Sequence, residues 1–259
     1  MISTFTSYSL INRDLDRALE RKAAEKTHAR EIEYFKNNIR SVETVDQFLD
    51  DSRLYGFAMR AFGLDDMIFA KGYMRKVLEE GVTSRDSFAN KLLDDRFKEF
   101  AAAFDFEGYG TAATQRAAAT SEAVARYTRL QLEVEAGAEN EGVRLALYFD
   151  RKVPEIDSYY DILADKALTE FFRTAMALPE AMSSIDIDQQ VKLLEKTFDL
   201  AALKDPEEVR NLTRRFTVMH DMNNAEPPPI MALFGDGPTR ATIDDGLIQA
   251  LQNLKFGGR

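Results

Sequence analysis

Apolar side chains recur at helical spacing along most of this chain, and strand-like alternation of apolar and polar residues is nowhere convincing. Between Val42 and Leu78 they recur every three or four residues, which predicts three short helices. The same spacing predicts a helix over Ser84–Phe104, capped by Ser84. Its expected buried face comprises Phe88, Leu92, Leu93, Phe97, Phe100 and Phe104. The pattern predicts an all-α fold.

The segment Asp14–Ile39 predicts one long helix with a narrow apolar stripe. Its middle, Glu20–Glu31, is almost wholly polar, so we expect this part either to project into solvent or to be available for binding a partner. Further along, Asp65 is placed to cap the helix that follows it, and Gly81 is placed to end that helix in a left-handed conformation.

The sequence also matches itself when it is shifted by 114 residues. The apolar positions of any two amphipathic helices can be aligned by choosing a suitable shift. Here, however, one constant shift holds over roughly 30 residues and across two helix boundaries. We therefore predict a duplicated helical module. The matched positions are mostly apolar: Tyr34-Phe35 with Tyr148-Phe149, Val42 with Ile156, Phe48-Leu49 with Ile162-Leu163, Asp51 with Asp165, Leu54 with Leu168, Phe57 with Phe171, Ala61 with Ala175 and Leu64 with Leu178.

We expect two tandem multi-helix modules of similar structure, residues 1–107 and 112–222, with Gly108–Thr114 as the connector. Residues 223–259 form a C-terminal appendage in this prediction. Three consecutive prolines, Pro227–Pro229, cannot continue a helix and favour an extended spacer. Thr242 and Asp245 predict the start of a last amphipathic helix, which must bury its stripe on its own body or on another molecule.

Charge and composition exclude several classes of function. The 259 residues include 44 acidic and 34 basic side chains, for a net charge of −10. This negative field argues against nucleic-acid and anionic-membrane partners. The absence of cysteine excludes disulfides and thiolate sites. No apolar run approaches the roughly 18 residues of a membrane span, and Met1–Ile11 does not resemble a cleaved secretory signal.

Few residues offer catalytic chemistry. We expect His28 to be a solvated residue of the polar helix, and His220 to lie near a helix end where a positive charge complements the dipole. Neighbouring acids lie near predicted helix ends, where capping explains them. These pairs are Asp50-Asp51, Asp65-Asp66, Asp94-Asp95 and Asp244-Asp245. We predict no catalytic, cofactor-binding or metal-binding residue, and no cofactor.

Two stretches of the chain carry a resemblance to a known family. Ser7–Gly81 contains TVDQFLDDSRLYGFAMRAFGLDDM, and Ser87–Phe106 begins with SFANKL. Through these motifs the chain resembles the bacterial "domain of unknown function 1217" family over nearly its whole length, although more weakly in the second half. The resemblance implies an all-helical, duplicated fold and an association with flagellar genes. It brings no catalytic residues with it.

We therefore expect a non-enzymatic structural or protein-interaction protein linked to flagellar assembly or motility. It would bind a flagellar component through its terminal helices or through the groove between its modules, either in the cytoplasm or after export through the flagellar apparatus without a cleaved signal peptide. The alternative is a small-ligand-binding protein or enzyme, with carboxylates and Tyr55, Tyr73 or Tyr160 in that groove. A chaperone-like adaptor is a third possibility, which requires a large exposed apolar patch.

Overall fold

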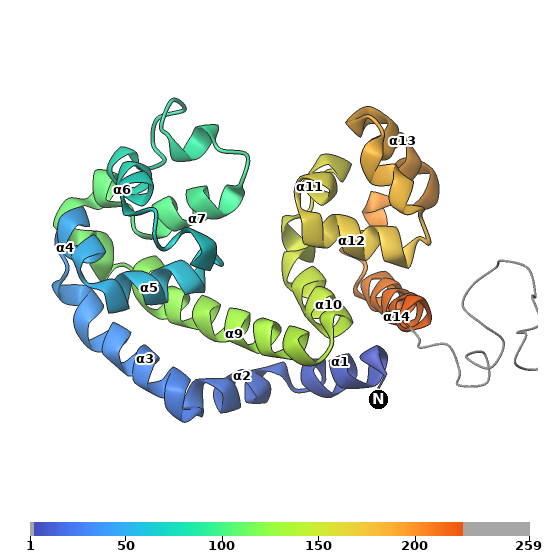
Figure 1. Cartoon of the computed structure of the whole chain (residues 1–259), viewed down its shortest axis with the longest axis horizontal. Coiled ribbons are helices and arrows are strands. Elements are labelled where there is room, and N and C mark those ends of the chain that lie inside the picture. Colours follow the sequence, from blue (N-terminus) through green and yellow to red (C-terminus); the bar gives the residue numbers. More distant parts are fainter. Residues whose placement is uncertain (1–2, 225–259) are drawn as a thin grey trace, which may run out of the picture. The chain divides into compact units, whose positions relative to one another are not determined.

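The computed structural model describes residues 3–224, and these residues form helices and turns without a strand (Figure 1). The predicted all-α fold is confirmed over this range. The α-helices are α1 (Thr4–Asn12), α2 (Leu15–Ala24), α3 (Lys26–Asn38), α4 (Val45–Asp50), α5 (Ser52–Ala61), α6 (Lys71–Glu80), α7 (Asp95–Ala103), α8 (Phe106–Tyr109), α9 (Ala123–Glu139), α10 (Glu141–Lys152), α11 (Tyr159–Ala164), α12 (Lys166–Ala175), α13 (Ile187–Thr197) and α14 (Pro206–Asn223).

Short helical turns join several of these helices. None of the described helices is both long and apolar enough to cross a bilayer. The expected appendage, with its prolines and its last helix, lies outside the described residues. The short turns are Ile39–Ser41, Asp65–Met67, Ala89–Lys91, Gly110–Gln115, Ala118–Glu122, Val153–Glu155, Glu180–Ser184 and Leu200–Lys204.

The single long helix expected over Asp14–Ile39 is wrong, because the chain bends at Glu25. That residue has an extended backbone, with ψ of 133°, and separates α2 from α3. After the bend α3 packs on α5, whereas α2 packs on α9. The polar segment Glu20–Glu31 has no continuous apolar stripe that could hold one straight helix against one partner. Therefore α2 and α3 each pack on a different helix. Lys22 is nearly fully buried, but most of Glu20–Glu31 is exposed, so this segment faces solvent as expected except at Lys22.

The three helices predicted between Val42 and Leu78 are present as α4, α5 and α6. Gly81 ends α6 with a positive φ of 58°, which favours glycine, but its ψ of −147° is not that of the predicted left-handed cap. Asp65 does not cap a helix with its side chain; it begins the short turn Asp65–Met67 instead.

The helix predicted over Ser84–Phe104 begins only at Asp95. The amide of Asn90 donates to the carbonyl oxygens of Val82 and Ser84, both at 2.8 Å. Such side-chain bonds to the backbone compete with the helical ladder, and here they hold an irregular loop.

Leu93 ends this loop and was expected in the core, but its side chain is 99% exposed. It lies immediately before Asp94, whose carboxylate accepts the amide hydrogen of Arg96 at 3.0 Å and so caps α7. Because the helix starts after Leu93, its apolar period does not include that residue. The remaining aromatic positions of the predicted face are buried or half-buried.

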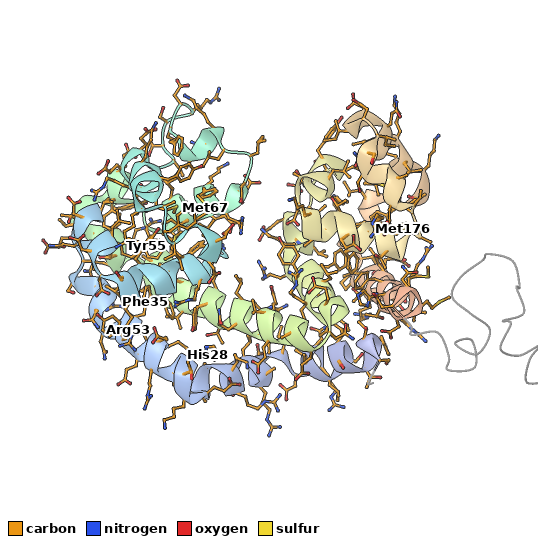
Figure 2. All side chains as sticks on the ribbon, in the orientation of Figure 1. His28, Phe35, Arg53, Tyr55, Met67 and Met176 are labelled. Carbon is orange, nitrogen blue, oxygen red and sulfur yellow. The ribbon has the colours of Figure 1, made fainter. Side chains whose placement is uncertain are left out.

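Two hydrophobic cores organise the described residues (Figure 2). The first runs from Ile32 to Tyr127 and the second from Val143 to Phe216, with Tyr8 added to the second. The expected connector Gly108–Thr114 is exposed up to Ala112; its end is buried at the first core, where Ala113 packs and the Thr114 hydroxyl donates to the backbone carbonyl of Val42. Contacts group Met1–Asp221 as one compact unit, apart from Met222–Arg259. The bounds predicted for the two modules remain a prediction.

Contacts in the two cores recur at the 114-residue spacing. The rings of Phe35 and Phe57 stack at 4.2 Å, and those of Phe149 and Phe171 stack at 3.9 Å. The chain leaves α5 through Gly63 with φ of 66°, and it leaves α12 at residue 177 with φ of 53°. In each case the next residue donates its amide hydrogen back to a helix carbonyl oxygen at 2.8 Å.

Helix α1 packs on α10 and is bonded to both α10 and α14. The amide and hydroxyl of Thr4 donate to the carboxylate of Asp221, with the amide 3.0 Å from Oδ2. The Tyr8 hydroxyl donates to Asp150, and the Thr213 hydroxyl is 3.4 Å from the other oxygen of that carboxylate. The first helix of the chain thus completes the second core.

The Asp150 carboxyl makes this packing dependent on pH. Burial raises its pKa, and hydrogen bonds from Tyr8 and Thr213 and the charge of Arg129 only partly oppose the rise. Because the Asp150 carboxyl has a higher pKa in the folded protein than in the unfolded chain, protonation favours the folded protein. This contribution to stability is complete below the unfolded-state pKa and is lost as pH rises through the folded-state pKa.

We expect Asp150→Asn to gain stability relative to the wild-type protein as pH rises from about 4 to about 7, because the variant carries no charge to bury. Urea denaturation at a series of pH values measures the difference in free energy of unfolding. A difference that is constant, or that moves in favour of the wild-type protein, contradicts this prediction.

Candidate functional site

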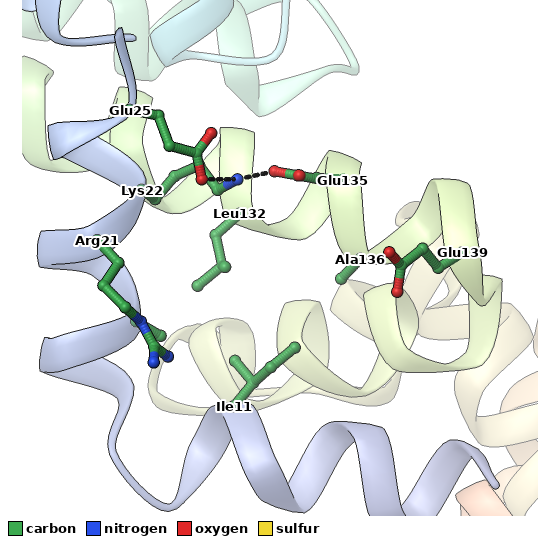
Figure 3. Close-up of a pocket in the computed structure, with 9 residues that line it drawn as sticks. Ile11, Arg21, Lys22, Glu25, Leu132, Glu135, Ala136 and Glu139 are labelled. Carbon is green, nitrogen blue, oxygen red and sulfur yellow. Dashed lines mark hydrogen bonds and ion pairs between the residues drawn. The ribbon is translucent and has the colours of Figure 1, made fainter. Parts of the chain in front are cut away.

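A pocket of about 230 Å³ opens between α1, α2 and α9 (Figure 3). It lies where the chain turns from α1 into α2, and side chains of all three helices face it. Apolar walls come from Ile11, Ala18, Leu132 and Ala136, and polar side chains come from Arg21, Lys22, Glu25, Glu135 and Glu139.

Lys22 joins two of these helices. Its ammonium is 2.7 Å from the Glu25 carboxylate and forms a second ion pair with Glu135 of α9 (Figure 3). A buried ammonium is costly unless it is paired, and two carboxylates meet that need here. Lys22 is therefore part of the packing of α2 on α9 rather than a free cation for a ligand.

The mouth of the pocket carries charges of both signs. Arg21 and Glu139 are exposed there, and within residues 3–224 neither forms an ion pair. Sites for small molecules usually enclose about 300 to 1,000 Å³. This pocket, with its apolar walls and charged rim, is smaller than that range.

A more open hollow of about 550 Å³ lies on α2 and α3, beside the start of α9. Alanines 23, 24 and 29, together with Ile32 and Val124, form its apolar surface. Both hollows thus border α2, the helix whose polar sequence suggested a waiting partner. Sequence reasoning missed the buried side of that helix, although Ala18 and Lys22 lie four residues apart, at helical spacing.

Glu133 is the most deeply buried acid of this region, with only 4% of its side chain exposed. Its carboxylate accepts from Arg129 at 2.9 Å and from Arg151 of α10 at 2.9 and 3.0 Å. Arg129 also donates to the carbonyl oxygen of Leu147. These bonds connect α9 to α10 and leave the carboxylate fully engaged in structure.

The two histidines lie in different places and do not share a site. His28 of α3 is not solvated as expected, because its Nδ1 is 3.0 Å from the Tyr127 hydroxyl and burial lowers its pKa against the opposing charge of Glu25. His220 lies near the end of α14, as predicted, and packs beside Phe216. Burial lowers the pKa of His220, which disfavours the charged form that a dipole interaction requires.

Three of the four acid pairs fall within the described residues, and two of these contribute caps as predicted. Asp51 caps α5 and Asp94 caps α7. Asp65 is 3.8 Å from Arg60 in an ion pair. Asp244-Asp245 lies outside the described residues. Over residues 3–224, no three His, Asp or Glu side chains are grouped so that they could hold a metal ion.

The tyrosines of the alternative hypothesis are not brought together. Tyr55 is fully buried in the first core, where burial raises its pKa to about 12 (Figure 2). Tyr73 packs edge-on against Phe88 and Phe97 of the same core. Tyr160 is exposed and donates to Asp188 of the second half.

Replacing the buried Glu133 tests its structural role. We expect Glu133→Ala to lower the free energy of unfolding by about 3 kcal/mol, because it leaves two partly buried guanidinium groups without a counter-ion. Glu141→Ala is the matched control: Glu141 pairs with Arg144 at the surface, and its loss costs less than about 1 kcal/mol. Equal losses in urea denaturation contradict the assignment.

Comparison with known proteins agrees with this fold. The family described as "Protein of unknown function (DUF1217)" matches residues 61–209. The crystal structure of protein AGR_C_984 from Agrobacterium tumefaciens is similar, with 47% sequence identity and a TM-score of 0.78. The alignment covers 86% of this chain and 97% of that one. Among curated proteins, none matches. The chain therefore belongs to the DUF1217 family, a family of unknown function.

Proposed function

We propose that this chain is a non-enzymatic protein-interaction protein whose partner is a component of the flagellum. The observation that carries the interaction is the exposure of two large apolar side chains, Leu93 at 99% and Phe69 at 83%. Large apolar side chains of this kind form the buried centre of many contacts between proteins.

The loops that carry these two side chains are fixed to each other. Arg96, three residues after Leu93, donates to the backbone carbonyl of Gly63 in the loop that leads to Phe69. The same guanidinium is held by the Asp94 carboxylate at 2.7 to 3.0 Å. A surface that is ordered before it binds loses less entropy on association.

Support for a flagellar partner comes from the resemblance in sequence to a family found among flagellar genes. The charge of −10 further favours a partner with basic residues near its apolar contacts. Whether the protein acts in the cytoplasm or is exported through the flagellar apparatus is part of the same proposal.

We further propose that the two cores are copies of one ancestral module. The recurring ring stacks and helix ends at the 114-residue spacing support this, since a chance overlap of apolar stripes does not require equal turns and equal caps. The alternative function, binding of a small ligand, finds its best support in the pocket between α1, α2 and α9 rather than in the tyrosines.

Swimming assays test the proposal in a normally motile strain from which the native gene has been deleted. We expect the wild-type chain to restore swimming and Leu93→Ser with Phe69→Ser to fail, because the variant loses apolar contact area without touching a core. Affinity capture followed by mass spectrometry should recover a flagellar component with the wild-type chain and not with the variant.

Val134→Ser is the matched control, because Val134 is 58% exposed on α9, away from both loops in sequence. It should leave swimming and capture unchanged. If the gene is dispensable for swimming and no flagellar component is captured, the flagellar proposal fails. If the Leu93 and Phe69 variant captures the component as well as the wild-type chain does, this surface is not the contact.

A further inference from the structure

One apolar stripe runs without interruption across the break between α1 and α2. Counting from Tyr8, side chains on this stripe recur at alternating steps of three and four residues, which is the spacing of a single helix with one buried face. The stripe consists of Tyr8, Ile11, Leu15, Ala18 and the stem of Lys22. The sequence therefore favours one helix over residues 4–24.

The structure instead bends this segment at Arg13 and Asp14. Neither residue is a glycine or a proline, so the bend is not imposed by the backbone chemistry of either one. The Asp14 side chain caps α2, but its oxygen is 3.4 Å from the Arg17 amide, at the long end of hydrogen-bond distances. The pocket described above lies on the inner side of this bend, between Ile11 and Ala18.

What holds α1 in the bent position is a specific set of contacts with the second half of the chain. Asp221 accepts hydrogen bonds from the backbone amide and the hydroxyl of Thr4, and the side-chain amide of Asn140 donates to that hydroxyl at 2.9 Å. Asp150 receives the Tyr8 hydroxyl, which also accepts from Asn12 at 2.8 Å. We call this surface of α10 and α14, with Asn140, the α1 seat.

The α1 seat selects α1 over other helices. It requires a hydroxyl residue at the helix start and a tyrosine four residues later, whose ring enters the second core. A helix of nine residues is not stable by itself in water, so α1 is ordered by its seat rather than by its own propensity. An element of this kind keeps every contact if it occupies the same seat on another molecule.

We propose that α1 exchanges between two copies of this chain. Residues 4–24 straighten into one helix, and α1 then fills the α1 seat of a second copy, which returns its own α1 in the same way. The contacts in the seat are identical before and after exchange, so the balance is set by the bend at Arg13-Asp14 and by protein concentration. This inference does not rest on the proposed function.

Asp14→Ala is the first test, because it removes the cap that starts α2 and places the best helix former at the bend. We expect it to raise the dimer association constant about fivefold over that of the wild-type chain, measured by size-exclusion chromatography with light scattering. Asp16→Ala is the matched control: it makes the same change in charge in the first turn of α2 without a cap, and it should leave the association constant unchanged.

Complementation distinguishes exchange from any other dimer. In the Asp14→Ala background, Tyr8→Ala damages the helix and Asp221→Ala damages the seat. Each substitution is chosen to detach α1 from the seat, so a variant alone gains no docked α1 by pairing and should be monomeric. An equal mixture should form dimers, because each mixed dimer then contains one intact helix in one intact seat. Circular dichroism of each variant verifies that it is folded, and Tyr8→Phe replaces Tyr8→Ala if the latter is not.

A mixture that stays monomeric overturns the proposal, as does a single variant that dimerises as well as the mixture. An Asp14→Ala chain whose association constant equals that of the wild-type chain also overturns it, because the bend then does not control exchange.

Discussion

In each core, one aspartate carboxylate joins the start of one helix to a tyrosine of a neighbouring helix, and we call this arrangement a carboxylate clamp. Asp51 accepts the first amides of α5 at 3.0 and 2.9 Å through one oxygen, and its other oxygen accepts the Tyr34 hydroxyl of α3 at 2.8 Å. Asp165 does the same for α12 and for the Tyr148 hydroxyl of α10. Each clamp joins the same two helices whose rings stack, α3 and α5 through Phe35–Phe57 and α10 and α12 through Phe149–Phe171.

A second constraint is the use of basic side chains inside an acidic protein. Lys22 ties α2 to α9, and Arg129 and Arg151 surround Glu133 between α9 and α10. These cations are committed to packing, whereas large apolar side chains such as Leu93 face solvent. The exposed apolar side chains are the basis of the proposed contact with another protein, and the proposed exchange of α1 is a separate route to self-association.

The sequence predicted what is decided locally. The all-α fold, helices α4 to α6, the end of α6 at Gly81 and the acids at helix starts depend on spacing within a few residues of each other. The bend at Glu25 and the burial of Lys22 depend on α9, which lies over a hundred residues away, and no local signal contains that partner. Leu93 was misplaced because side-chain bonds from Asn90 delay the start of α7. The pocket was missed for the same reason as the bend, since it is formed by helices distant in sequence.

The central claim is that each clamp stabilises its own core independently of the other. Native-state hydrogen exchange on Asp51→Ala and Asp165→Ala, followed by mass spectrometry, tests it most directly. The account predicts faster exchange in α3 to α5 for the first variant and in α10 to α12 for the second, with the other core keeping its wild-type protection. Equal loss of protection in both cores for either variant would contradict it.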